Sequence, residues 1–310
     1  VCITESLNRS WSVSMGFTNL DQTRLLNEDH ILRIGSVTKI YTASLIMRLM
    51  EEGYFTLDSQ ISEYFPQHDH VSEVTILDLL QHTSGITDIF TIPAIFINAS
   101  HFPDKQWDLH QLAETCMNKP LHFEPGSGQS YSNTNYIILG LIAEQVTGEP
   151  LAELFTEYLF GPLDLKNTFF VPYQESPAQL ISGYVHHYAL SLKEWYATDP
   201  ENTSWSTLAF SAGAMVTNAS GLSSFMHHLF IQGLVSQASL DQMTEFSGRR
   251  GPGLVRMNVN ERIYYGHEGE ITGFESVTGY NPENGWTISI CCNTTPFRVK
   301  ELLDQIDARL

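Results

Sequence analysis

The sequence is short of positive charge. Its 310 residues include 16 Lys and Arg against 35 Asp and Glu, which gives a formal net charge of -19 at pH 7. Phosphate backbones and anionic lipid surfaces repel a chain this acidic, so we expect neither nucleic acid nor an anionic membrane as a partner. The sequence also lacks any run of about 18 apolar residues, so it predicts no transmembrane segment.

Patterns typical of metal sites are missing as well. The chain has only 4 cysteines, and they lack the spacing of a metal-ligand set. The histidines form no His-Glu-x-x-His motif. We therefore expect no metal site and no cofactor. A disulfide that involves Cys2 stays open at this stage.

Two motifs of common enzyme families are absent too. No Gly-x-Ser-x-Gly segment occurs, which counts against an α/β-hydrolase with a nucleophile elbow. No Gly-Lys dipeptide occurs, which excludes a phosphate-binding P-loop. A nucleophile of another kind has to be sought.

What the sequence does contain is a serine and a lysine three residues apart. Ser36 and Lys39 lie at the start of a segment that is predicted to be helical. Residues at i and i+3 share one face of a helix, so the hydroxyl and the amine can meet there. Such a pair can act as a nucleophile and its base. Alone the pattern is weak, because a serine at a helix N-terminus is more often a capping residue.

Two later motifs add further groups for acyl transfer. Tyr131 and Asn133 form Tyr-x-Asn, and His267 and Gly269 form His-x-Gly. Acyl transfer needs an activated nucleophile, a proton carrier and a place for the oxyanion. The three motifs together supply groups of these kinds.

The motifs and their order resemble those of the serine β-lactamase and penicillin-binding protein superfamily. The branch that the chain resembles holds class C β-lactamases, D-alanyl-D-alanine carboxypeptidases and related esterases. The resemblance runs from about Gly16 to Asn293, and it is supported by residues 79–85, 136–148, 161–163 and 211–225.

The resemblance implies a metal-independent serine hydrolase that forms an acyl-enzyme on Ser36. Lys39 and Tyr131 would carry the proton as a coupled pair, and which of them is the acylation base stays open. To act as a base near neutrality, Lys39 would need a pKa roughly 3 units below its usual value of about 10.4. The backbone N–H groups of Ser36 and Glu270 would form the oxyanion hole.

The resemblance also implies which residues bind the substrate. Asn133 would orient Lys39 and bind a substrate carbonyl. His267 would hydrogen-bond the Tyr131 hydroxyl and add positive charge when protonated. Gly269 would let the substrate approach the strand edge closely.

Apolar periodicity predicts strands near both ends of the chain and helices between them. The expected strands cover residues 10–17, 255–259, 262–265, 274–280 and 286–292, and the expected helices cover residues 36–52, 75–81, 136–146, 221–231 and 297–310. One mostly antiparallel sheet is then built from both termini, with a mostly helical insert. This is the α+β, β-lactamase/transpeptidase-like fold that the resemblance implies.

This pattern also predicts how the chain divides. We expect a sheet subdomain from residues 1–58 and 241–310, a mostly helical subdomain from residues 59–240, and the active site in the cleft between them. In the first strand, alternation places Trp11, Val13, Met15 and Phe17 on one half-buried side.

The sequence departs from the family pattern at the third motif. His267-Glu268-Gly269 replaces the Lys-Thr-Gly that is common in true β-lactamases, and no class A Glu-x-x-Leu-Asn motif occurs. Glu268 and Glu270 point to the same side of a strand. If that side faces the cleft, each would repel a substrate carboxylate by about 1 kcal/mol or more, and if it faces solvent neither would matter. We therefore favour a neutral or amine-bearing substrate.

The resulting hypothesis is a serine hydrolase that acts on a small ester, amide or D-amino-acid peptide. One alternative is a slow penicillin-binding protein, a DD-carboxypeptidase or a β-lactamase. Another is a scaffold that has the same fold and acts by self-association. Relatives are often exported, which favours the periplasm or secretion, although no signal peptide is visible at Val1. The oligomeric state is left open.

Overall fold

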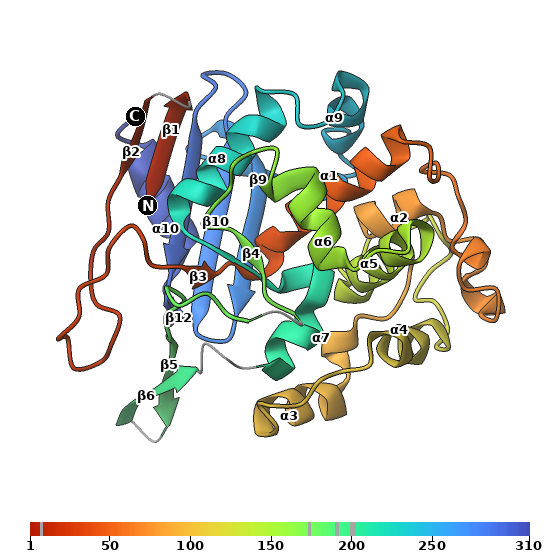
Figure 1. Ribbon diagram of the computed structural model, residues 1–310, viewed down its shortest axis with the longest axis horizontal. Coiled ribbons are helices and arrows are strands. Elements are labelled where there is room, and N and C mark those ends of the chain that lie inside the picture. The colour runs from red at the N-terminus through yellow and green to blue at the C-terminus, as the bar shows by residue number, and fades with distance from the viewer. Residues whose placement is uncertain (7–8, 173–174, 190–191, 199–202) are drawn as a thin grey trace.

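The two ends of the chain form one antiparallel sheet, as the sequence predicts. The computed structural model describes residues 1–6, 9–172, 175–189, 192–198 and 203–310, without the side chains of 187–198. In this part of the chain, a six-stranded sheet has the order β2-β1-β11-β10-β9-β8 (Figure 1). Its strands are β2 (Arg9–Ser12), β1 (Cys2–Ser6), β11 (Thr287–Cys292), β10 (Phe274–Tyr280), β9 (Arg262–Ile271) and β8 (Val255–Val259).

Two smaller sheets of three strands each accompany the main sheet among the described residues. One contains β12 (Thr294–Thr295), β5 (Gly183–Ala189) and β6 (Leu192–Thr198), and the other contains β3 (Leu32–Arg33), β7 (Met215–Thr217) and β4 (Phe169–Phe170). The sequence analysis did not predict these short strands.

Most helices lie between the two groups of sheet strands along the chain. The longer ones are α1 (Thr38–Glu51), α3 (Pro93–His101), α4 (Leu109–Met117), α5 (Asn133–Thr147), α7 (Thr203–Gly213), α8 (Ala219–Phe230) and α10 (Val299–Asp307). Shorter ones are α2 (Ile76–Gln81), α6 (Leu151–Phe155), α9 (Gln237–Met243) and the single turns η1 (Gly35–Val37), η2 (Ile61–Glu63), η3 (Asp69–Val71), η4 (Ile89–Thr91) and η5 (Thr156–Phe160).

Helices cover both faces of the main sheet. Ile288 and Ile290 of β11 pack in one cluster with Leu303 of α10. On the opposite face, the Ser223 hydroxyl of α8 donates to the Thr4 hydroxyl of β1 at 2.7 Å. The central strands β10 and β11 are therefore buried along most of their length.

Helix α5 is the centre of the helical region. It contacts α1, α2, α4 and α7, and ten consecutive residues from Thr134 to Ala143 are buried. A helix that is apolar on every side is a core helix. Its burial fixes the place of its first residue, Asn133, whose Oδ1 lies 2.8 Å from the Nζ of Lys39 in the first turn of α1.

The prediction of a half-buried strand over residues 10–17 was wrong. The strand ends at Ser12, and Trp11 and Met15 are 51% and 82% exposed. Among the described residues β2 is an edge strand that pairs with β1, and all four of its residues are exposed. Trp11 instead packs against Trp286, with ring centroids 6.4 Å apart.

Other boundaries differ from the expected ones, most of them by one to three residues. The strand that was predicted to end at Tyr265 continues to Ile271, because β9 pairs with β10 along its whole second half. The helix predicted over 136–146 begins at Asn133 and ends at Thr147. The four cysteines are free thiols, and Cys2 is buried without a disulfide.

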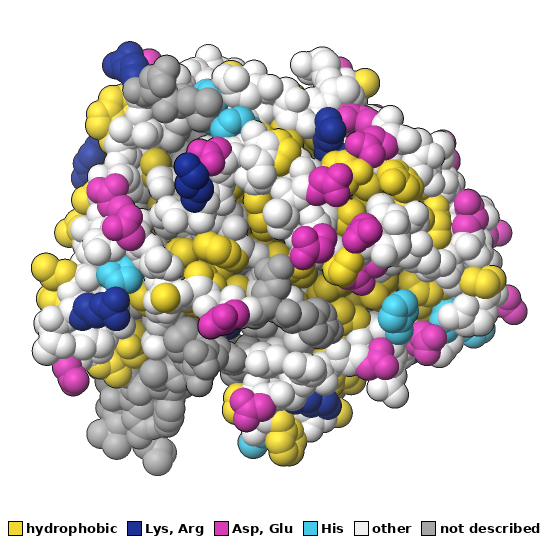
Figure 2. Space-filling model, in the orientation of Figure 1, with side chains coloured by type: hydrophobic (Ala, Val, Ile, Leu, Met, Phe, Trp, Pro, Cys, Tyr) yellow, Lys and Arg dark blue, Asp and Glu magenta, His cyan; other side chains and the backbone are white. Residues whose placement is uncertain are grey.

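The surface agrees with the acidic composition. Figure 2 shows Asp and Glu side chains spread over this face of the molecule, while Lys and Arg occur at separate points. In the described part of the chain, none of the helices combines the length and the apolar character that a membrane crossing requires.

Candidate active site

Ser36 lies in the turn η1, immediately before α1, rather than in the helix itself. Gly35 precedes it with φ of +50°, a conformation that favours glycine. A Cβ at Gly35 would stand only 2.7 Å from the backbone oxygen of Glu270. The glycine therefore allows the serine turn and strand β9 to lie against each other.

Lys39 is completely buried beside the serine. Its Nζ donates to the Ser36 Oγ at 3.2 Å, to the Asn133 Oδ1 at 2.8 Å and to the Ala212 carbonyl at 2.7 Å. Burial lowers the pKa of Lys39 to about 7, and the nearby carboxylate of Asp88 opposes this effect only in part. A substantial fraction of Lys39 is therefore neutral at neutral pH.

Tyr131 approaches the serine from the other side. Its hydroxyl donates to the Ser36 Oγ at 2.8 Å, and its ring centroid lies 4.8 Å from the Lys39 Nζ. Burial raises the pKa of Tyr131, which keeps the phenol protonated in the resting site. Hydroxyl, amine and phenol are thus joined in one hydrogen-bonded group.

His82 holds the tyrosine segment in place. It ends α2 in a left-handed conformation, and its ring lies 4.4 Å from the Tyr131 ring. The backbone N–H of Ser132 donates to its Nδ1 at 3.1 Å, and that of Ser130 donates to its carbonyl at 3.0 Å. These contacts make His82 a support for Tyr131.

Asn133 is held by a residue that the sequence analysis missed. The Asn133 amide nitrogen lies 3.1 Å and 3.2 Å from the two carboxylate oxygens of Asp88, which also accepts from the Asn133 backbone N–H. This arrangement turns the amide oxygen toward Lys39. The only sequence signal for Asp88 is its position before the turn η4, where its carboxylate caps Phe90.

Strand β9 carries His267 and Gly269. A Cβ at Gly269 would stand 2.0 Å from the Ile34 carbonyl, so this glycine makes room for the chain next to Ser36. His267 is buried, and its ring centroid lies 6.3 Å from that of Tyr131. Burial and the nearby Lys39 lower its pKa to about 3, so His267 is neutral at neutral pH, unlike the charged form considered from the sequence.

The two predicted oxyanion donors lie on adjacent pieces of backbone. The Glu270 nitrogen is 2.9 Å from the Cβ position at Gly35, and η1 contacts β9. The N–H of Ser36 belongs to the same turn. The two predicted donors therefore belong to backbone segments that lie against each other.

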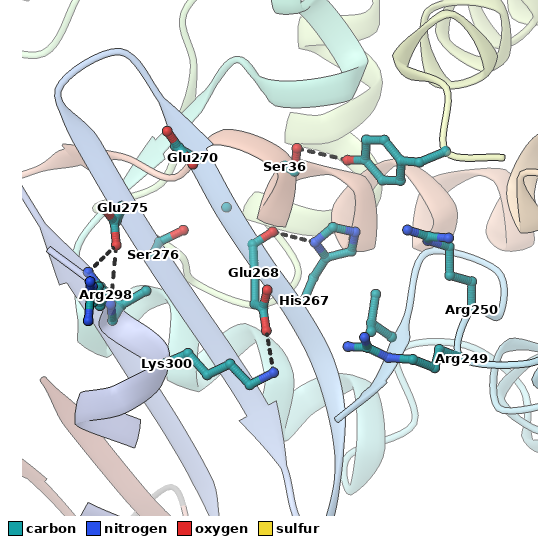
Figure 3. A pocket seen from close by; sticks show the side chains of 14 residues that line it. Ser36, Arg249, Arg250, His267, Glu268, Glu270, Glu275, Ser276, Arg298 and Lys300 are labelled. Atoms are coloured by element: carbon teal, nitrogen blue, oxygen red, sulfur yellow. Dashed lines mark hydrogen bonds and ion pairs between the residues drawn. The ribbon is translucent and has the colours of Figure 1, made fainter. Parts of the chain in front are cut away.

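Ser36 lies between two pockets. The first, of about 590 Å³, is called here the charged pocket, and it is lined by Ser36, Tyr131, Arg249, Arg250, Val255, His267, Glu268, Gly269, Glu270, Glu275, Ser276, Arg298, Val299 and Lys300 (Figure 3). The second, of about 500 Å³, is called the aromatic pocket, and it is lined by Gly35, Ser36, Phe90, Phe96, Ser100, Asn133, Val185, Trp205, Ala209, Ala212, Gly213, Glu270, Ile271, Thr272 and Thr295.

Glu268 and Glu270 both line the charged pocket. The sequence left open whether this side of the strand faces the cleft or solvent, and the structure shows that it faces the cleft. Figure 3 shows that Glu268 extends to Lys300, whose Nζ is 3.4 Å from its carboxylate. Glu270 lines both pockets, and partial burial together with the charge of Glu275 raises its pKa. Of the two carboxylates, Glu270 is therefore the one without a neutralising partner in the described chain.

Among the residues that the structure describes, no group of three or more His, Cys, Asp or Glu is arranged to hold a metal ion.

Two penicillin-binding proteins are similar to this chain in sequence. Penicillin-binding protein 4* of Bacillus subtilis (strain 168) is 28% identical over 290 residues, which cover 89% of this chain and 58% of that protein. Penicillin-binding protein 4 of Amycolatopsis lactamdurans is 31% identical over 191 residues, which cover 60% of this chain and 46% of that protein. The chain thus spans less than two thirds of the length of these relatives.

Solved structures of amidases have the same fold. D-amino acid amidase from Ochrobactrum anthropi SV3, complexed with L-phenylalanine amide, aligns with a TM-score of 0.86 and 26% identity over 99% of this chain and 91% of that chain. A D-stereospecific amidohydrolase from Streptomyces sp. aligns with a TM-score of 0.75 and 27% identity over 86% of this chain and 83% of that chain. The model of the family described as Beta-lactamase matches residues 1–309. With this match over almost its whole length, the chain belongs to the Beta-lactamase family of serine hydrolases.

Proposed function

We propose that this protein is a metal-independent serine hydrolase that forms an acyl-enzyme on Ser36. The observation that carries the proposal is the contact of the Ser36 Oγ with both the Tyr131 hydroxyl at 2.8 Å and the Lys39 Nζ at 3.2 Å. A nucleophile within hydrogen-bond reach of its base is the geometry that such catalysis requires. The amidase relatives are hydrolases of the same fold, which supports this reaction class.

The reaction would take place in two steps. The Ser36 Oγ bonds to the substrate carbonyl carbon and passes its proton to the Lys39 and Tyr131 pair, which then protonates the leaving group as the scissile bond breaks. The N–H groups of Ser36 and Glu270 would hold the carbonyl oxygen when it becomes negative. Water then attacks the acyl-enzyme and returns the proton, so that the acid is released and Ser36 is restored.

The remaining predicted residues would position the substrate. Asn133 holds Lys39 through its amide oxygen, so its bond to Asp88 keeps the base oriented. The strand that carries His267 and Gly269 forms a wall of the charged pocket. The substrate class is a small ester, amide or D-amino-acid peptide, which agrees with the amides named for the solved relatives.

Labelling with a fluorophosphonate tests the nucleophile directly. We expect one adduct per chain, and peptide mapping should place it on Ser36. Ser36→Ala should abolish labelling, and Lys39→Ala should slow it by about 100-fold or more, because the general base is lost. Ser130→Ala is the matched control, since this exposed serine lies beside Tyr131 and should leave labelling unchanged. A label on another residue would refute the proposal.

A slow penicillin-binding protein is the second candidate, and the penicillin-binding relatives favour it. It would acylate Ser36 but hardly release the acyl group. Intact-protein mass after incubation with penicillin distinguishes the slow penicillin-binding protein from the hydrolase, because only the slow protein keeps the penicilloyl adduct for hours. A self-associating scaffold would keep its size-exclusion profile in Ser36→Ala and would turn over no substrate in either form.

A further inference from the structure

The aromatic pocket has an unusual combination of lining groups. Phe90 stacks on Trp205 with ring centroids 6.1 Å apart, and Phe96 meets the same indole edge-on at 5.4 Å. Among its described lining residues, Glu270 is the only one with an ionisable acid or base. A pocket that is lined by one carboxylate and several aromatic rings is suited to an organic ammonium group, because both attract positive charge.

Glu270 is available for such a ligand, unlike the carboxylates near it. Glu268 pairs with Lys300. Glu275 accepts from the backbone N–H groups of residues 297, 298 and 299 at 2.6, 2.8 and 3.2 Å, which occupies it at the start of α10. The Glu270 carboxylate has no hydrogen bond or ion pair to the described part of the chain. Glu270 is exposed to solvent, so its carboxylate is free to meet a ligand that enters beside Ser36.

The charged pocket is less suited to an ammonium group, because four Arg and Lys side chains line it beside its three Glu side chains. Figure 3 shows Arg249 and Arg250 on one side of β9, and Arg298 and Lys300 on the other. Lys300 is paired with Glu268, whereas neither Arg249 nor Arg250 lies within ion-pair distance of a carboxylate in the described chain. The two halves of a substrate that meet at Ser36 therefore encounter different charged groups among the described residues: unpaired arginines in the charged pocket and a single carboxylate in the aromatic pocket.

We propose that Glu270 binds the protonated amine on the acyl half of the substrate, so that the natural substrates are aminoacyl amides or esters with a free amine and an apolar or aromatic side chain. This inference rests on the proposed function, because the substrate carbonyl that Ser36 attacks separates the acyl half from the leaving group. The amine lies near Glu270, the side chain enters the aromatic pocket, and the leaving group enters the charged pocket.

Matched substrates with and without the amine test this assignment. D-Phenylalanine p-nitroanilide and 3-phenylpropionyl p-nitroanilide differ only in that group. In Glu270→Gln we expect kcat/KM to fall by about 10- to 100-fold for the first, as for loss of one charge-assisted hydrogen bond, and to stay within about threefold for the second. The backbone N–H at position 270 is kept in this variant. Glu268→Gln is the matched control, and it should change both substrates equally.

A binding measurement keeps the test independent of the chromogenic leaving group. 2-Phenylethylamine should slow fluorophosphonate labelling of Ser36 in the wild type and lose most of this protection in Glu270→Gln. 3-Phenylpropanol should protect both proteins equally. If Ser36 is not labelled at all, the proposed function fails. If labelling is normal but neither kinetics nor protection distinguishes the amine in Glu270→Gln, only the assignment of Glu270 is overturned.

Discussion

The two pockets beside Ser36 are similar in size but differ in chemistry. The charged pocket, of about 590 Å³, has four Arg and Lys side chains and three Glu side chains among its described lining residues. The aromatic pocket, of about 500 Å³, has three large aromatic rings and one carboxylate there. Ser36 and Glu270 belong to both. The difference indicates that the leaving group and the acyl group are selected by separate sets of residues.

The residues that make this difference lie outside the motifs. Ser36, Lys39 and Tyr131 form the shared chemical centre, and they come from the motifs of the family. Phe96 and Arg249, by contrast, belong to segments without a motif and reach the serine only through the fold. Substitutions in these segments can therefore alter substrate preference while the acyl-transfer centre stays the same.

The largest expected effect concerns the proton that the leaving group needs. In Tyr131→Phe the hydroxyl that contacts Ser36 is lost, while the ring can still pack on His82. We expect kcat/KM for an amide to fall by about 100- to 10,000-fold, since general acid–base catalysis is removed. An activated aryl ester should lose less, because its leaving group departs without protonation.

Steady-state kinetics on the amide and ester pair checks this prediction. Tyr136→Phe is the matched control, since its buried hydroxyl donates to the Leu80 carbonyl and does not contact Ser36. The control should have lower stability and an unchanged ratio of amide to ester turnover. Equal losses for amide and ester in Tyr131→Phe would show that the phenol does not serve the leaving group.

The next prediction concerns the positive side chains that line the charged pocket. The sequence led us to expect that Glu268 and Glu270 repel a substrate carboxylate, but Glu268 is paired with Lys300, whereas Arg249 and Arg250 have no carboxylate partner in the described chain. A leaving group that carries a carboxylate should therefore be favoured over a neutral one in the charged pocket. In Arg249→Gln we expect kcat/KM for the carboxylated substrate alone to fall by about 5- to 10-fold, with a smaller loss at high salt because the field is screened. Arg256→Gln, which does not line the pocket, is the control. An equal change for the neutral substrate would contradict a charge effect.

The sequence predicted the sheet and the groups of the site because both follow from local patterns. Alternation and apolar runs mark the strands of the main sheet, and Ser36, Lys39, Tyr131 and Asn133 are parts of short motifs. The structure places these four side chains within one hydrogen-bonded group. The boundary at Asn133 was missed because the first turn of α5 is defined by its contact with Asp88, which is 45 residues away.

Other features depend on contacts that no local pattern records. The alternation of Trp11 and Met15 looks like that of a buried strand, but burial is decided by whether a helix covers the sheet edge. The charge state of His267 follows from its burial beside Lys39. The orientation of Glu268 toward Lys300 depends on α10, which lies more than 30 residues further along the chain. Strand geometry alone left open whether this side faced the cleft.

A smaller effect tests the wall of the aromatic pocket. Phe96 is 51% exposed, so Phe96→Ala should fold normally and lose only part of a hydrophobic contact with the substrate. We expect kcat/KM for a phenylalanyl substrate to fall by about 3- to 5-fold, and that for an alanyl substrate to stay the same. Phe102→Ala, an equally exposed position outside both pockets, is the control. Equal losses for the two substrates would show that the acyl side chain binds elsewhere.

The smallest expected effect shows which group titrates near neutrality. Lys39 has a pKa of about 7, so it is protonated below this pH and becomes able to accept a proton above it. The profile of kcat/KM should therefore rise with pH through about 7. His267, in the charged pocket, has a pKa of about 3 and is already neutral throughout this range. In His267→Gln the rate can change, but the midpoint of the rise should move by less than about half a pH unit, because only one nearby neutral group has replaced another. A shift of a full unit or more would assign the titration to the histidine and place the controlling proton in the charged pocket instead of on Lys39.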